Sequence, residues 1–162
     1  ICPYGWHVPS STEWCELENN LNPGIDVTCS NANWRGTMSK MLSAPAIWTQ
    51  FSDNSFTPGY WYSDSSTHNT TGFSAIPAGY TRYASITTYY EGNSTYPYTC
   101  YLGNTGWHTH YYYPFTGKNT TARYWTSTVG KFRAMAYNQT GIYYGSGEDE
   151  RSAFSVRCVK DY

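Results

Sequence analysis

AFSVRCVK, at residues 153–160, alternates apolar and polar side chains, as a half-buried β-strand does. The preceding stretch, YYGSGEDER at residues 143–151, has neither a hydrophobic period nor a usual catalytic motif. We therefore expect residues 153–160 to form the closing strand of the core. The fold is expected to require only solubility and turns from the preceding stretch, so that stretch is a candidate recognition segment.

Two helices are expected near the N-terminus. The stretch from Ser10 to Glu13 (SSTE) matches a capping box, in which the Ser hydroxyl and the Glu carboxylate bind the unpaired amides of a first helical turn. Apolar residues then follow at helical spacing: Trp14, Leu17 and Leu21. The sequence NPG at 22–24 ends this helix, and a second helix is predicted at 37–43.

The chain after residue 47 has the pattern of turns and short strands. Strands are predicted at 124–128, 132–137 and 154–160. Helices that precede antiparallel strands indicate an α+β domain. A length of 162 residues suits one domain with a substantial core.

Aromatic residues make up an unusual 19% of the chain, with 18 Tyr and 7 Trp. A domain of this size cannot bury so many phenol hydroxyls with partners, so part of them must lie on the surface. Exposed Tyr among Ser, Asn, Thr and Gly is typical of binding faces. Only 13% of residues are charged and the net charge is −1, which argues against nucleic acid as a partner. Five Cys indicate an oxidising compartment.

Four blocks of sequence carry a family resemblance: CPYGWHVPSSTEW at 2–14, GFSAIPAGY at 72–80, YWTST at 124–128 and FSVRCVKD at 154–161. In this order they resemble the Fibrobacter-type major paralogous (FISUMP) domain, whose pattern runs CPxGWxxPtxxEW … GFSAxPaGy … yWSSt … GFSVRCVkd. Ala153 stands where that pattern has Gly, and residues 81–123 are much longer than the usual link. The resemblance implies a single domain over 1–162 with an insertion at 81–123.

The FISUMP domain is similar to C-type-lectin-like domains. This likeness implies two helices, a small antiparallel sheet joining the N- and C-terminal strands, and a long loop-rich, Tyr-rich ligand face. In such a fold Cys2 and Cys158 would lie on neighbouring strands and form a disulfide. Cys15 could pair with Cys29; the alternative is a bond from Cys15 to Cys158, as in animal C-type lectins. Cys100 would then have no partner within the chain.

The framework blocks also contain the residues expected in the core. They are Trp6, Trp14, Phe73, Ile76, Trp125, Phe154 and Val156. Their strand or helix spacing indicates packing rather than recognition.

Similar domains with FSVRC-like endings are the variable proteins of diversity-generating retroelements, which randomise template adenines just before the fixed final strand. The resemblance therefore implies a binding face, open to diversification, on strands 132–137 and 141–145 and on the loop 146–152. The candidate ligand-binding residues are Arg133, Met135, Tyr137, Gln139, Thr140, Ile142, Tyr143, Tyr144, Ser146, Glu148, Asp149, Glu150 and Arg151.

We expect no enzyme activity, no cofactor and no metal. The hydrolase motifs GxSxG and HExxH do not occur in the sequence. Oxidases of similar fold use two neighbouring cysteines near the C-terminus, where this chain has only Cys158. His108 and His110 would share one face of a strand, but no further ligand is near them in the sequence. Residues 148–150 (EDE) could offer oxygen ligands to calcium, although a solvated acidic loop is the simpler interpretation.

The leading hypothesis is a non-catalytic ligand-binding or receptor-recognition domain of an extracellular bacterial or phage protein. Its partner would be a protein or glycan on a cell or phage-host surface, with no nucleic acid and no direct membrane insertion. Residues 81–123 would form a second wall of the binding face. The alternative is a structural or adhesive surface module without diversification, with glycan binding as one form of it.

Overall fold

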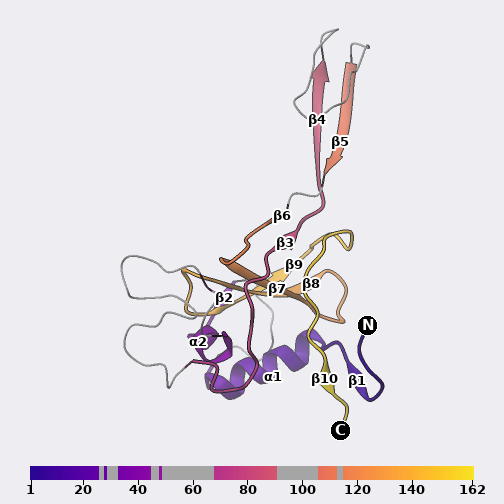
Figure 1. Cartoon of the computed structure of the whole chain (residues 1–162). Helices are drawn as coiled ribbons and strands as arrows, with labels where there is room; N and C mark the ends of the chain where they lie inside the picture. Colours follow the sequence, from indigo (N-terminus) through magenta and orange to yellow (C-terminus); the bar gives the residue numbers. More distant parts are fainter. Residues whose placement is uncertain (26–27, 29–32, 45–47, 49–67, 91–105, 113–114) are drawn as a thin grey trace.

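Two helices and ten short strands are formed by the residues that the structure describes (Figure 1). The structure is a computed structural model that describes residues 1–25, 28, 33–44, 48, 68–90, 106–112 and 115–162, with backbone only for 84–90 and 106–112. The helices are α1 (Ser11–Leu21) and α2 (Ser39–Leu42). The strands are β1 (Trp6–His7), β2 (Trp34–Arg35), β3 (Tyr80–Thr81), β4 (Ala84–Tyr90), β5 (Gly106–Tyr112), β6 (Phe115–Thr116), β7 (Thr121–Trp125), β8 (Lys131–Ala136), β9 (Ile142–Ser146) and β10 (Val159–Lys160).

Both helices lie where the sequence predicted them. The Ser10 hydroxyl accepts a hydrogen bond from the Glu13 amide (3.2 Å), and the Ser10 amide donates one to the Glu13 carboxylate (2.7 Å). Helix α1 ends at Leu21, and α2 falls within the predicted 37–43. Both helix predictions are thus confirmed. The sequence could predict them because the residues that begin and end a helix are close neighbours in the chain.

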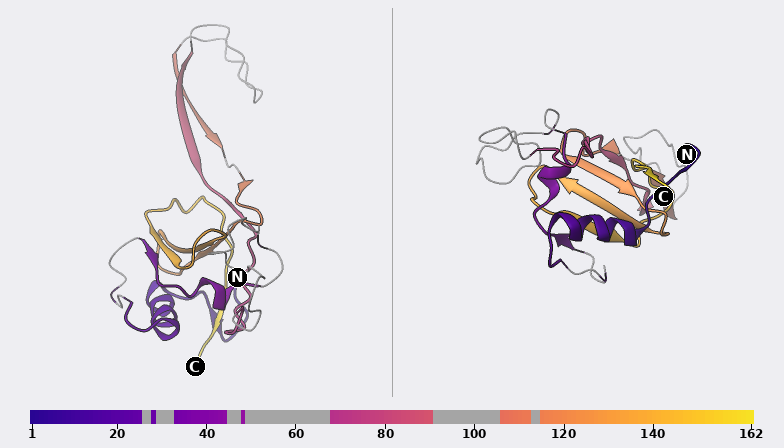
Figure 2. Two further views of the ribbon diagram at one scale, coloured as in Figure 1. Left: turned by 90° about the vertical axis from the view of Figure 1, so that its left-hand side faces the viewer. Right: turned by 90° about the horizontal axis from the view of Figure 1, so that it is seen from below.

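The centre of the domain is an antiparallel sheet in the order β2-β9-β8-β7. Both helices lie on the same side of this sheet (Figure 2). Side chains from the helices and the sheet meet in one core cluster, which includes Trp14, Met38, Leu42, Ala122, Tyr124, Met135 and Ile142. The α+β class is therefore confirmed. Strands β7 and β8 begin at Thr121 and Lys131, earlier than the predicted 124 and 132.

Successive residues of the central strands point to opposite faces of the sheet. Buried residues on the helix side are Ala122, Tyr124, Arg133, Met135, Ile142 and Tyr144. Residues on the opposite, open face are Thr121, Arg123, Phe132, Ala134, Ala136, Tyr143 and Gly145. The sheet thus divides the predicted recognition segment between core and surface.

Glu18 of α1 lies between two arginines inside the core. Its carboxylate accepts hydrogen bonds from Arg35 Nε and Arg133 Nε, both at 2.6 Å. Arg133 also donates to the backbone oxygen of Ser11 (3.1 Å) and stacks on the Tyr144 ring, 4.4 Å from its centroid. Burial lowers the pKa of Arg133, and the charge of Glu18 opposes that shift. This charged cluster ties α1 to β2 and β8.

The two ends of the chain are joined. Strands β1 and β10 pair antiparallel, and a disulfide links Cys2 to Cys158, as the resemblance implied. Because Cys158 is used in this bond, the alternative pairing of Cys15 with Cys158 is wrong. Cys15 is itself disulfide-bonded, but Cys29 and Cys100 lie outside the described residues, so its predicted pairing stays a prediction.

The closing segment 153–160 is not one continuous strand, contrary to the prediction. Only its Val159–Lys160 part belongs to a strand, β10. Ala153 makes a single bridge to β3, and Ser155 makes a single bridge to β7. The alternating pattern therefore serves three successive partners, because the segment passes along the edges of separate sheets.

Two of the predicted core residues are exposed. Trp6 is 43% exposed because β1 is a two-residue strand that pairs only with β10. Ile76 is also exposed, since the neighbouring Ala75 is the residue that points into the core. Trp14 is buried as predicted. The remaining predicted core residues are partly buried: Phe73, Trp125, Phe154 and Val156.

Strands β4 and β5 form a two-stranded ribbon that projects away from the rest of the domain (Figures 1 and 2). It is paired from Ala84 opposite Tyr112 to Tyr90 opposite Gly106. The ribbon lies within the segment 81–123, whose status as an insertion stays a prediction. The last residues of that segment belong to β7 and hence to the central sheet.

His7 connects three segments that are distant in sequence. Its Nδ1 lies 2.6 Å from the Asp161 carboxylate, and its Nε2 lies 2.7 Å from the Glu13 carboxylate. The hydrogen bond with Asp161, followed by that with Glu13, raises the pKa of His7 above its usual 6.5. The imidazolium thus holds β1, α1 and the C-terminal residues together.

This contact predicts a pH-dependent stability. Because the pKa of His7 is raised in the folded state, its contribution is fully present below the unfolded pKa of 6.5 and is lost as pH rises through the folded value. The melting temperature of the native chain should therefore fall relative to that of a His7→Gln variant as the pH rises above about 6.5. Parallel curves for the two proteins across this range would contradict the prediction.

Candidate ligand-binding site

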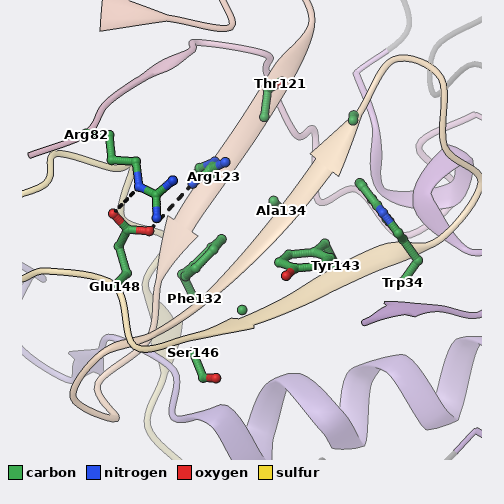
Figure 3. A pocket seen from close by; sticks show the side chains of 11 residues that line it. Trp34, Arg82, Thr121, Arg123, Phe132, Ala134, Tyr143, Ser146 and Glu148 are labelled. Carbon is green, nitrogen blue, oxygen red and sulfur yellow. Dashed lines mark hydrogen bonds and ion pairs between the residues drawn. The ribbon is translucent and has the colours of Figure 1, made fainter. Parts of the chain in front are cut away.

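A hollow of about 310 Å³ lies on the open face of the central sheet, opposite the helices (Figure 3). Residues of β2, β7, β8 and β9 form most of it, and the segments after β3 and β9 complete it. Its lining residues are Trp34, Arg82, Thr121, Arg123, Phe132, Ala134, Ala136, Tyr143, Gly145, Ser146 and Glu148. The volume lies at the lower end of the range of small-molecule sites.

Aromatic rings form one end of the hollow. Trp34 on β2 stands directly opposite Tyr143 on β9, and their ring centroids are 5.3 Å apart with the planes tilted by 57°. Phe132 continues the row, 6.0 Å from Tyr143. Trp34 is 37% exposed. An aromatic surface is therefore open to a ligand.

The floor of the hollow is made of small residues. Ala134 and Ala136 supply only methyl groups, and Gly145 stands opposite Phe132 across the β8–β9 pair. A Cβ at Gly145 would lie 2.1 Å from the Phe132 ring, so the ring lies against the bare backbone. Glycine at this position thus permits the close approach of an aromatic ring.

Charged groups form the other end of the hollow. The Glu148 carboxylate accepts hydrogen bonds from Arg82 Nε (3.0 Å) and from the Ser152 hydroxyl (2.9 Å). Arg123 Nη1 lies 3.9 Å from the same carboxylate, too far for a hydrogen bond. The Glu148 side chain is only 3% exposed. This end therefore holds two guanidinium groups for one fixed carboxylate.

Aromatic rings, rather than hydrogen bonds, hold Arg123. Its guanidinium lies 3.7 Å from the Tyr80 ring centroid, with Phe132 and Phe154 at 5.0 and 5.3 Å. Burial lowers the pKa of Arg123. Its Nε atom is buried and has no hydrogen-bond partner in the part of the chain that the structure describes. Because the Arg123 side chain is still 18% exposed and lies 3.9 Å from its nearest carboxylate, its guanidinium is suited to an acceptor supplied from the hollow.

Comparison with known protein families shows to which family the chain belongs. The family model described as Fibrobacter succinogenes major domain matches residues 1–160. The chain belongs to this family. Neither the curated proteins nor the solved structures gave a match. The C-type-lectin-like architecture expected for this major domain therefore stays a prediction, beyond its α+β class and its disulfide between the chain ends.

The predicted ligand-binding residues of the major domain fall into three groups. Tyr143, Ser146 and Glu148 line the hollow. A second group is buried on the helix side of the sheet and cannot contact a ligand there: Arg133, Met135, Ile142 and Tyr144. The others lie before or after β9, away from the hollow: Tyr137, Gln139, Thr140, Asp149, Glu150 and Arg151. The division follows from strand alternation, which a segment without a hydrophobic period does not reveal.

The acidic run 148–150 is not a uniformly solvated loop. Glu148 is buried in its contacts with Arg82 and Ser152. Asp149 binds Arg151, and the hydrogen bond from that side chain lowers the pKa of Asp149 to about 2. Glu150 is exposed. The three carboxylates thus have separate partners and environments.

Several residues of the site escaped the sequence prediction. Trp34 belongs to a two-residue strand, which leaves no usable period in the sequence. Arg82 and Arg123 lie within the segment treated as an insertion. A signal did exist for Arg123, because the pattern TARYW at 121–125 places Ala122 and Tyr124 on one face and Arg123 on the other.

The described part of the major domain contains neither a cluster of metal-binding side chains nor a helix that could span a membrane. Among these residues, no three His, Cys, Asp or Glu side chains gather as a metal site would need. His108 and His110 lie on β5, whose side chains are outside the described part. None of the described helices is long and apolar enough to cross a bilayer.

Proposed function

We propose that this major domain is a non-catalytic ligand-binding module and that the open-face hollow is its binding site. One observation carries the proposal: exposed Trp34, half-buried Tyr143 and the charged trio of Arg82, Arg123 and Glu148 meet over one small-residue floor. Concave sites with aromatic walls and a few convergent polar groups are typical of small-ligand binding.

The architecture separates the framework from the binding surface. Helix-side residues of β8 and β9 contribute to the core, whereas the alternate residues of the same strands line the hollow. A rigid sheet therefore holds Tyr143 and Phe132 at fixed positions, which reduces the entropy that binding would cost.

The proposed partner is a protein or glycan on a cell or phage-host surface. Domains of this family are typically surface modules in Fibrobacter-type proteins. The disulfide between Cys2 and Cys158 suits an oxidising, extracellular setting. The net charge of −1 does not favour nucleic acid.

Replacing Trp34 with Ala should abolish binding without affecting the fold. The probes are a panel of neutral and acidic sugars together with short aromatic and acidic peptides, added to the isotope-labelled domain and followed by NMR. At least one probe should give saturable shifts at the Trp34 indole and the Gly145 amide, and Trp34→Ala should lose them because it removes the outer aromatic wall. Trp6→Ala is the matched control, since Trp6 is similarly exposed at 43% against 37% but lies on β1.

A panel without a binder at these groups, or binding unchanged in Trp34→Ala, would overturn the proposal. Either result would favour the alternative of a structural or adhesive module.

We also propose that retroelement diversification acts on this chain and is confined to positions of the segment outside the buried core. Arg133, Met135 and Ile142 are fully buried, so randomising them would disrupt the core. Tyr143 and Ser146 line the hollow and can vary without disturbing that core. The test is the neighbouring DNA, which should contain a reverse transcriptase gene and a near-copy of the 3′ coding end that differs at template adenines. A neighbourhood without such a repeat would refute diversification and leave the binding proposal unaffected.

A further inference from the structure

We propose that the hollow binds a sugar ring that carries a single negative charge, with the ring on Trp34 and Tyr143 and the anionic group at Arg123 and Arg82. The inference rests on the proposed function and specifies the class of ligand. Three properties of the hollow carry it: its charge, its aromatic surface and its position over the centre of the sheet.

The charge at the polar end favours an anion. Two guanidinium groups face one carboxylate, which leaves one positive charge over. Glu148 is already bound by Arg82 and Ser152, whereas Arg123 has, besides its aromatic contacts, a long ion pair of 3.9 Å with Glu148. A ligand carboxylate would supply the charge-assisted hydrogen bonds that Arg123 does not make within the described residues.

The fixed carboxylate limits the ligand to one negative charge. Glu148 is buried beside Arg123, so any anion bound there also lies close to the Glu148 charge. One negative charge neutralises the positive charge left over, whereas the second charge of a phosphate monoester would be desolvated beside Glu148 without a counter-ion of its own. The site is therefore matched to a singly charged group.

The rest of the hollow matches a sugar ring. One face of a pyranose consists of C–H bonds, which pack on the electron-rich face of an aromatic ring. Trp34 and Tyr143 offer such faces. Hydroxyl groups of Thr121 and Tyr143 line the same space and can exchange hydrogen bonds with sugar hydroxyls.

An extended peptide is a poorer match. Peptides commonly bind by pairing their backbone with a free strand edge. The hollow lies over β8 and β9, which are interior strands with neighbours on both sides. It thus offers side chains, not backbone groups, to a ligand.

The test compares four methyl glycosides by isothermal titration: a glucuronide, the neutral glucoside, a glucoside sulfate and a glucoside phosphate. We expect the glucuronide to bind at least about tenfold more tightly than the glucoside, with an advantage that shrinks as salt is added. The phosphate should bind less tightly than the better of the two singly charged probes. The ranking of glucuronide and sulfate identifies which single charge the site prefers.

Variants assign the effect to the arginines. Arg82→Gln and Arg123→Gln should each remove about tenfold of the glucuronide affinity and reduce the glucoside affinity by a much smaller factor. Arg151→Gln is the matched control, because the Arg151 and Arg82 side chains are both 58% exposed and each pairs with one carboxylate, but Arg151 does not line the hollow. If Arg123→Gln fails to fold, Arg123→Lys replaces it. Lys keeps the charge but has fewer hydrogen-bond donors, so it should still weaken glucuronide binding.

Equal binding of glucuronide and glucoside would overturn the charge assignment and leave the proposed function intact. Tighter binding of the phosphate would overturn the single-charge limit. If only peptide probes occupied the hollow, the sugar assignment would be wrong but the site would stand. An absence of any binder at Trp34 and Gly145 would overturn the proposed function together with this inference.

Discussion

Replacing Glu18 with Gln should lower the free energy of unfolding by about 3–5 kcal/mol, which approaches the whole stability of a typical domain. The carboxylate is fully buried and receives hydrogen bonds from both Arg35 and Arg133. Gln keeps the size of the side chain but removes its charge. Two buried guanidinium groups would then lose the carboxylate that they share.

Denaturant unfolding followed by circular dichroism measures this effect. Glu16→Gln is the matched control because Glu16 is exposed on the same helix, and its effect should stay within about 0.5 kcal/mol. A loss below about 1 kcal/mol for Glu18→Gln would contradict the assignment of Glu18 as a shared counter-ion of Arg35 and Arg133.

Replacing Glu18, Arg35 and Arg133 together by Met tests the same assignment by removing the whole charged cluster. Because the triple variant removes all three of these buried charges, it should recover most of the stability that the single variant loses. A triple variant as unstable as Glu18→Gln would show that packing, not charge, governs this cluster.

Removal of the bond between Cys2 and Cys158 should have the second large effect. The two cysteines are separated by 156 residues in sequence, so the bond closes a loop that contains nearly the whole chain. The chain-entropy model assigns such a loop about 5 kcal/mol, which corresponds to a fall of about 10–20 °C in melting temperature. The β1–β10 pair has only two residues on each strand and cannot replace the bond.

The double variant Cys2→Ser/Cys158→Ser isolates this bond, because it avoids an unpaired thiol and leaves the disulfide of Cys15 in place. Adding reductant to the native protein gives a comparison in which every accessible disulfide opens. A melting temperature for the double variant within about 3 °C of the native value would contradict the loop-closure account.

Local signals predicted most of the secondary structure correctly. The capping box placed α1, and the strands 132–137 and 141–145 closely match β8 and β9. The closing segment was less well predicted, since an alternating pattern does not say whether one partner or three will satisfy it. The family resemblance, rather than the pattern of residues, supplied the disulfide of Cys2 with Cys158.

The candidate site was harder to predict because polar residues break the usual rule of burial. Arg133 and Glu148 carry charges that normally indicate exposure, yet both are buried. Glu18 neutralises Arg133 from 115 residues away, and Arg82 neutralises Glu148 from 66 residues away. The spacing of residues in the sequence does not reveal either of these two ion pairs.

The amino-acid sequence alone therefore determined the helix boundaries and the α+β class, because these depend on neighbouring residues. It also determined the family, because four sequence blocks occur in the order typical of that family. Tertiary structure decided which alternate residues of the segment 133–151 face the hollow and which face the core. It also brought Trp34, Arg82 and Arg123 to Tyr143 and Glu148. The physical reason is that a sheet assembles a surface from alternate residues of strands that are far apart in the chain, and only strand pairing and register specify which residues become neighbours.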